Sequence, residues 1–238
     1  MARRFDLAAY AYAHRGLWLK EGPPENSLAA FRAAANAGLG AELDLRPSAD
    51  GTAMIFHDSQ MDRMTAGAGL FEAHTADALM ATRLTGYDER IPCFDDLLDF
   101  WPDDLPLLCE MKIDGSTDPA AFARTIAAHL AVWPGLAAAM SFSEDAVRAL
   151  PDTLMRGQLV VPITYTDGET FDAIVKRAVA DGIDYLAVHH SDLARTIPLA
   201  AGTPVVTWTV RSEAELAAAR AYKPAIIFEH IDPALAEP

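Results

Sequence analysis

The chain has 238 residues, of which 51% are hydrophobic and 22% are charged, an ordinary balance for a folded protein with a full core. Lysine and arginine number 19 against 34 aspartates and glutamates, so the formal net charge is −15. So negative a surface repels phosphate backbones and anionic lipid, which argues against nucleic-acid or membrane-surface binding as the main role. Two cysteines, Cys93 and Cys109, are too few for a disulfide framework or a four-cysteine zinc site.

The amino-terminal sequence gives little sign of a targeting segment. Arg3 and Arg4 supply its positive charge, but the stretch that follows is interrupted by Asp6, His14 and Arg15. No apolar run reaches the roughly 18 residues needed to cross a bilayer. We therefore expect a cytoplasmic protein with no stable membrane insertion.

Apolar strand-like pieces alternate with alanine-rich amphipathic pieces along the chain. Strands are predicted at 11–13, 41–45, 53–56, 105–111, 138–142, 156–161, 185–188, 204–210 and 225–228. Helices are predicted at 25–38, 75–82, 118–132, 143–150, 168–180 and 212–221. Eight strand-then-helix units predict a single α/β domain over residues 1–238, a (β/α)8 TIM barrel. An open doubly wound sheet is the alternative, because periodicity alone does not show closure.

The segment after the second strand breaks this rhythm. Asp50 and Gly51 predict a hairpin turn between the strands at 41–45 and 53–56. Turn residues then dominate from 59 to 92, with one short helical piece at 75–82. So long an excursion in a compact domain is usually a lid or a binding loop. We therefore expect residues 59–92 to form a small inserted module over one end of the barrel.

Polar and charged side chains gather at the ends of predicted strands. The groups are His14-Arg15-Gly16 with Glu25-Asn26-Ser27 beyond it, then Glu42-Leu43-Asp44, His57-Asp58 and Glu110-Met111-Lys112. Because successive side chains of a strand point to opposite faces, Glu42 and Asp44 share one face, with the neighbouring leucines on the other. The same alternation places Glu110 and Lys112 together. Barrel active sites lie at the carboxyl ends of strands, where these groups fall.

If Glu42, Asp44 and Glu110 converge, they require a counter-ion or a shared proton. Two like charges about 4 Å apart repel by about 4 kcal/mol at an effective dielectric constant of 20. Three such pairs approach about 10 kcal/mol, comparable with the stability of a whole domain. Oxygen-only ligands favour Mg²⁺, Ca²⁺ or Mn²⁺ over zinc. The sequence thus predicts one divalent cation at these carboxylates.

Two histidines, His14 and His57, complete a set that one reaction requires. Cleaving a phosphodiester needs a neutralised phosphate charge, a deprotonated nucleophile and a protonated leaving alkoxide. A cation with Arg15 and Lys112 supplies the first, and a histidine pair supplies the other two near neutral pH. Each group alone has a simpler explanation as solvated surface, turn or ion pair. Their conjunction on strand ends predicts a metal-assisted phosphodiesterase.

These residues also carry a family resemblance. The chain resembles the glycerophosphodiester phosphodiesterase family in the motifs Ala13-His-Arg-Gly16, Glu25-Asn-Ser27, Ala41-Glu-Leu-Asp-Leu45, Ile55-Phe-His-Asp58, Glu110-Met-Lys112 and Val206-Thr-Trp-Thr-Val210. The resemblance implies a TIM barrel with an insertion after its second strand. It also implies a small-molecule glycerophosphodiester substrate, cleaved to glycerol 3-phosphate and an alcohol.

The resemblance further assigns roles to single residues. It implies that Glu42, Asp44 and Glu110 hold one divalent metal, usually Mg²⁺ or Ca²⁺, that His14 and His57 are the acid–base pair, that Arg15 and Lys112 bind the phosphate, and that Trp208 walls the pocket. Glu25 lies in a family motif, where catalytic support and loop structure are both open. The ending Phe228-Glu-His-Ile-Asp-Pro233 departs from the family's usual Thr-Asp-x-Pro, which leaves the head-group preference open.

Several alternatives stay open from the sequence. A lysophospholipase D-like activity uses the same chemistry on a lipid substrate, and a non-catalytic phosphoester-binding barrel would keep the same polar residues. A metal-using aldolase or sugar-phosphate isomerase would have no evident use for the two histidines. Neither the assignment of acid and base, nor the choice of water or substrate hydroxyl as nucleophile, follows from the sequence. Monomer and homodimer are both compatible with it.

Overall fold

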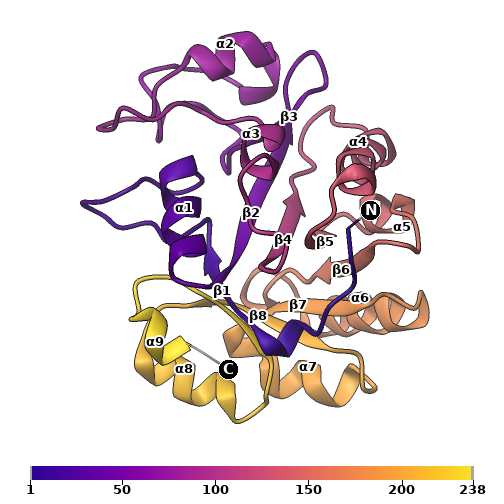
Figure 1. Ribbon diagram of the computed structural model, residues 1–238. Helices are drawn as coiled ribbons and strands as arrows, with labels where there is room; N and C mark the ends of the chain where they lie inside the picture. The colour runs from indigo at the N-terminus through magenta and orange to yellow at the C-terminus, as the bar shows by residue number, and fades with distance from the viewer. Residues whose placement is uncertain (1, 237–238) are drawn as a thin grey trace.

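A computed structural model describes residues 2–236 of the chain, and within them the strands close into a barrel (Figure 1). In hydrogen-bonded order the barrel strands are β1 (Ala11–His14), β2 (Gly40–Pro47), β4 (Pro106–Met111), β5 (Leu136–Ser141), β6 (Met155–Leu159), β7 (Tyr185–His189), β8 (Val205–Val210) and β9 (Ala225–Phe228). All neighbours are parallel, and β9 pairs back with β1. Closure confirms the predicted (β/α)8 barrel and excludes the open sheet.

Helices surround this barrel, as Figure 1 shows. They are α1 (Leu28–Asn36), α4 (Pro119–Val132), α5 (Glu144–Ala149), α6 (Gly168–Ala180), α7 (Leu193–Leu199), α8 (Glu213–Arg220) and α9 (Pro233–Ala236), with short 3₁₀ turns η1 (Leu7–Ala9), η3 (Ile163–Tyr165) and η4 (His190–Asp192). Helix α7 was not predicted from the sequence, because Pro198 lies inside it and it is only two turns long. None of the described helices is long and apolar enough to span a bilayer.

The first helix begins later than the prediction of 25–38. Ser27 is its N-cap, where the hydroxyl accepts a hydrogen bond from Ala30 N at 3.1 Å. Asn26 precedes the cap with φ +57°, and its side chain points away to Asp44. Residues 25–27 therefore form a turn at the mouth of the barrel rather than the first turn of the helix.

Side-chain alternation sorts the strand residues into two layers. Tyr12, Leu108 and Met140 belong to the cluster that fills the barrel interior. Leu43 and Cys109 belong to the outer cluster, which packs the strands against the helices. The predicted parity of the second and fourth strands is thus confirmed, and it leaves the intervening polar side chains facing the mouth.

The strand β3 (Ala53–Ile55) runs antiparallel to β2 and begins the excursion after the second barrel strand. The predicted turn joins these strands, with Gly51 at φ +85°, a conformation that glycine adopts readily. The segment then holds η2 (Phe71–Ala73), α2 (Ala76–Ala81) and α3 (Phe94–Leu98), with α2 beside β3 at the top of Figure 1. It has a small core of its own, in which Phe56 stacks on Phe71 at 4.7 Å.

Candidate active site

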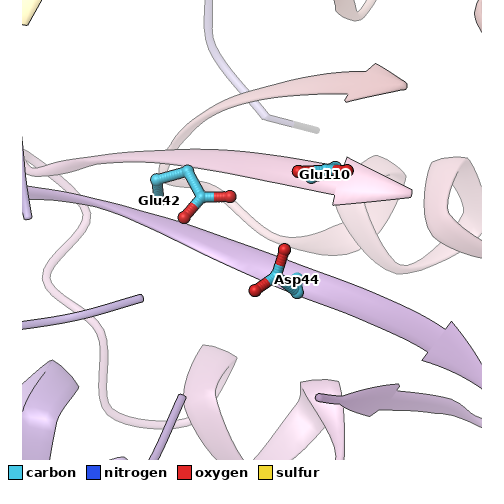
Figure 2. A group of neighbouring side chains, drawn as sticks. All are labelled: Glu42, Asp44 and Glu110. Carbon is cyan, nitrogen blue, oxygen red and sulfur yellow. The ribbon is translucent and has the colours of Figure 1, made fainter. Parts of the chain in front are cut away.

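Three carboxylates meet at the carboxyl ends of β2 and β4. Glu42 and Asp44 lie two residues apart on β2, and the register pairs Asp44 with Glu110 on β4. All three side chains are buried, and each offers an oxygen within 4.8 Å of the others. Figure 2 shows them converging from the two strands. The three carboxylates that were grouped from the sequence therefore lie together in the structure.

The charges at this cluster are incompletely balanced by the protein. Burial, reinforced by Asp44 and Glu110, raises the pKa of the Glu42 carboxyl well above its usual value. Burial also raises the pKa of Glu110, with Asp44 adding to the effect and Lys112 opposing it. For Asp44, burial is outweighed by Lys112 and Arg15, so its pKa lies well below the usual range. The all-oxygen donor set and its surplus negative charge fit a hard divalent cation such as Mg²⁺ or Ca²⁺.

Two cations of the protein lie against these carboxylates. Lys112 Nζ lies 2.9 Å from Asp44 Oδ1 and 2.6 Å from Glu110 Oε1. Arg15 donates from its backbone N to Glu42 Oε2 at 3.1 Å, and its Nε lies 3.2 Å from Asp44 Oδ2. Both cations therefore lie beside the carboxylate cluster, and both line the cavity at the mouth of the barrel.

The turn after β1 sets the direction of the Arg15 side chain. Its backbone has φ +58°, and Gly16 follows at φ +79°. A Cβ at Gly16 would lie 2.8 to 3.0 Å from atoms of Ala30 and Phe31, so only glycine fits so close to α1. Arg15 Nη1 also donates to Glu25 Oε1 at 2.8 Å. Glu25 thus lies behind Arg15 and outside the pocket lining, a position that favours support of Arg15 over direct contact with substrate.

His14 is held by a carboxylate that the sequence analysis did not identify. Its Nδ1 lies 2.6 Å from Oε2 of Glu229, the residue directly after β9, and its Nε2 lies 3.9 Å from Glu42. Glu229 is 7% exposed and also accepts a hydrogen bond from Arg211 at 2.5 Å. The strand-end rule that selected Glu42 and Glu110 also applies to Glu229, so a signal was present in the unusual ending at 228–233.

His57 is held in a corresponding way. Its Nδ1 lies 2.6 Å from Oδ1 of the adjacent Asp58, and its backbone oxygen accepts a hydrogen bond from Arg46 Nε at 2.8 Å. Burial lowers the pKa of both His14 and His57 below 6.5, and their carboxylate neighbours oppose this shift only in part. Because an ionised carboxylate can only accept a hydrogen bond, each neutral ring carries its proton on Nδ1 and keeps a free lone pair on Nε2.

The mouth of the barrel holds a cavity of about 320 Å³. Its polar lining is His14, Arg15, Glu42, His57, Glu110, Lys112, His189, Thr209 and Arg211, and its largely apolar wall is Met140, Phe142, Leu159, Pro162, Tyr165, Trp208 and Ile227. The predicted site residues all line it except Asp44 and Glu25, which lie behind the lining. Trp208 meets Phe142 edge to face at 5.8 Å, which makes an aromatic wall beside the carboxylates.

The fold and the site define a class, namely TIM barrels with an acidic cluster and two carboxylate-held imidazoles at the strand ends. The chain belongs to the glycerophosphoryl diester phosphodiesterase family, whose model matches residues 14–232. Glycerophosphodiester phosphodiesterase 1 of Bos taurus is 52% identical over 60 residues, which are 25% of this chain and 18% of that protein. The match therefore spans less than a fifth of that curated relative.

Solved structures confirm the fold over nearly the whole chain. A phosphodiesterase of Oleispira antarctica, in complex with its product sn-glycerol 3-phosphate, superposes with a TM-score of 0.78 at 22% identity, covering 95% of this chain and 94% of that one. The glycerophosphodiester phosphodiesterase of Thermotoga maritima gives a TM-score of 0.74 at 21% identity, with 96% of each chain covered. At such identities the likeness shows the barrel and leaves the chemistry to the site itself.

Proposed function

We propose that this protein hydrolyses glycerophosphodiesters to glycerol 3-phosphate and an alcohol with the help of one divalent cation. The observation that carries the proposal is the meeting of Glu42, Asp44 and Glu110 at one cavity, which His14 and His57 both line. Family membership supports the reaction type. The Oleispira antarctica structure with glycerol 3-phosphate supports the same product class.

The phosphate would lie against the positive side of the cavity. A divalent cation held by Glu42, Asp44 and Glu110 would supply neutralisation of the charge on the nonbridging phosphate oxygens. Arg15 and Lys112 add fixed positive charge at the same place, because each is anchored by buried carboxylates. Such preorganised charge stabilises a transition state without reorganisation during the reaction.

The two imidazoles divide the proton transfers. One neutral ring removes a proton through Nε2 from the nucleophile, either water or the glycerol hydroxyl of the substrate. The other ring, once protonated, gives a proton to the departing alkoxide. Burial lowers the pKa of His14 and of His57, which keeps the base neutral at pH 7 and makes the protonated ring a stronger acid. Glu229 and Asp58 fix the tautomer that this division needs.

The test is release of glycerol 3-phosphate from glycerophosphocholine by the purified protein, with Mg²⁺ or Ca²⁺ and with a chelator. We expect chelator-sensitive release, which Glu42→Ala and His57→Ala abolish while the circular dichroism spectrum is kept. His74→Ala is the matched control, because His74 lies outside the cavity. Full activity of either site variant, or turnover that the chelator does not reduce, contradicts the proposal.

A second candidate, lysophospholipase D-like activity, is favoured by the aromatic wall. Tyr165 and Phe142 are 83% and 38% exposed, and both line the cavity. Exposed aromatic side chains at a cavity rim offer contact to an acyl chain. Release of choline from lysophosphatidylcholine at a rate above that from glycerophosphocholine would establish a lysophospholipase D-like activity. Release from glycerophosphocholine alone would exclude it.

We also infer a small-molecule substrate, a cytoplasmic location and a monomeric or homodimeric state. The acidic sequence supports the first inference, and the two free cysteines support the second. Cell fractionation tests the location. Light scattering on the purified protein tests the oligomeric state.

A further inference from the structure

One arginine of the excursion after β3 reaches back to the site. Arg63 lies on a turn between Met61 and Thr65, whose hydroxyl donates to Met61 O at 2.8 Å. Met61 is buried in the small core of the excursion, and Thr65 is buried beside it. The backbone that carries Arg63 is therefore anchored on both sides, and its guanidinium projects from a fixed base.

The guanidinium of Arg63 binds two carboxylates at once. Its Nε and Nη2 donate to the two oxygens of Asp58 at 2.5 and 3.0 Å. Its Nη1 and Nη2 donate to the two oxygens of Glu25 at 3.0 and 2.6 Å. Bidentate pairing of this kind fixes orientation as well as charge, since both groups are planar.

Each of these carboxylates has a second partner in the candidate site. Asp58 Oδ1 accepts from His57 Nδ1 at 2.6 Å, and Glu25 Oε1 accepts from Arg15 Nη1 at 2.8 Å. His57 and Arg15 both line the cavity, whereas Arg63 does not. A single guanidinium thus stands behind one proposed proton-transfer group and one proposed phosphate-binding group.

We propose that Arg63 is a positioning residue that fixes the His57 tautomer through Asp58 and the Arg15 side chain through Glu25. The excursion after β3 then contributes to the site itself, because its Arg63 fixes the orientations of both His57 and Arg15. Lysine at this position would keep the positive charge and lose the planar fork, since an ammonium cannot form both bidentate pairs.

The first test measures the tautomer of His57 and does not depend on catalytic activity. In ¹⁵N spectra of the imidazole side chains, His57, identified by the signals missing in His57→Gln, is expected as a single tautomer with the proton on Nδ1. Arg63→Lys and Arg63→Gln are expected to give a mixture of tautomers. Arg83→Gln is the matched control, because within residues 2–236 the exposed side chain of this arginine of the same excursion forms an ion pair with Asp88 alone. It should keep the single tautomer.

The second test is kinetic and rests on the proposed function. With glycerophosphocholine, Arg63→Lys is expected to lower kcat/KM by about 10- to 100-fold, with kcat reduced through His57 and KM raised through Arg15. In an Asp58→Asn background the same substitution should reduce kcat much less than in the wild type, because the path to His57 is already broken. Arg63→Lys should still raise KM in the Asp58→Asn background, but it should no longer raise KM in a Glu25→Gln background.

Definite results would overturn the proposal. One such result is an unaltered single His57 tautomer in Arg63→Lys. The other is a kcat loss in the Arg63→Lys, Asp58→Asn double variant that equals the product of the two single losses. If Arg63→Gln does not fold, Arg63→Lys carries the test. An inactive wild type would refute the proposed function instead, and the tautomer measurement would still decide on Arg63.

Discussion

His14 Nδ1 lies 2.6 Å from Glu229 Oε2, so the first strand of the barrel is joined to the last at the candidate site. The two residues are 215 positions apart in the chain, and β1 and β9 are neighbours only because the barrel closes. Arg211, just past β8, holds the same carboxylate at 2.5 Å. The orientation of one proposed catalytic imidazole therefore depends on contacts that span almost the whole sequence.

Glu229→Gln should lower the activity of the protein without unfolding it. Glutamine keeps the size of the side chain but removes the charge that orients His14 and stabilises its protonated form. We expect kcat/KM for glycerophosphocholine to fall roughly 10- to 100-fold, mainly in kcat. Steady-state kinetics measure this loss. Glu213→Gln, an exposed glutamate in the first turn of α8, is the control and should be near wild type.

The same carboxylate should make stability depend on pH. Burial raises the pKa of Glu229, but bonds from His14 and Arg211 outweigh it and bring the pKa to about 2, against 4.5 for a free side chain. The stabilisation is thus complete above pH 4.5 and is lost as the pH falls from 4.5 towards 2. Urea unfolding should show that the advantage of wild type over Glu229→Gln shrinks by about 1 kcal/mol between pH 7 and pH 3.5. A constant or growing advantage would contradict this assignment.

Cation binding at the carboxylate cluster should appear in thermal unfolding. At a hundredfold excess over its Kd, Mg²⁺ or Ca²⁺ adds about 2.7 kcal/mol, which for a chain of this size raises Tm by roughly 5 to 10 °C. Glu42→Gln should remove that rise. Without cation it should be at least as stable as wild type, because burial and its carboxylate neighbours already raise the pKa of Glu42. Glu169→Gln, an exposed residue on α6, should keep the wild-type response.

The barrel interior should be intolerant of added volume at Gly157. A Cβ there would lie 2.2 Å from Cζ of Tyr185, whose ring is fully buried. Gly157→Ala is therefore expected to destabilise the protein by about 1 to 3 kcal/mol in denaturant unfolding. Tyr185→Phe is the opposite case, because among the described residues the buried Tyr185 hydroxyl has no hydrogen-bond partner. Its removal should leave stability unchanged or raise it by about 1 kcal/mol.

The local sequence pattern was enough to predict much of the barrel. The alternation of Glu42 and Asp44 with Leu43 places the acids at the mouth and the leucine under the helices, as the structure confirms. Ser27 caps α1, as serine commonly does at the start of a helix. The prediction was weakest where local signals conflict: α7 contains Pro198, and α3 is only five residues long. A short or interrupted helix owes its stability to packing, which periodicity does not report.

What the sequence determined by itself is the set of residues and the face each one occupies, since a strand repeats every two residues whatever surrounds it. What only the tertiary structure decided is which faces meet. The Asp44–Glu110 pairing comes from strand register, the His14–Glu229 bond from closure of the barrel, and the position of Arg63 from the small core of the excursion after β3. Such contacts join distant segments, and their geometry follows from the packing of the whole chain rather than from any local pattern.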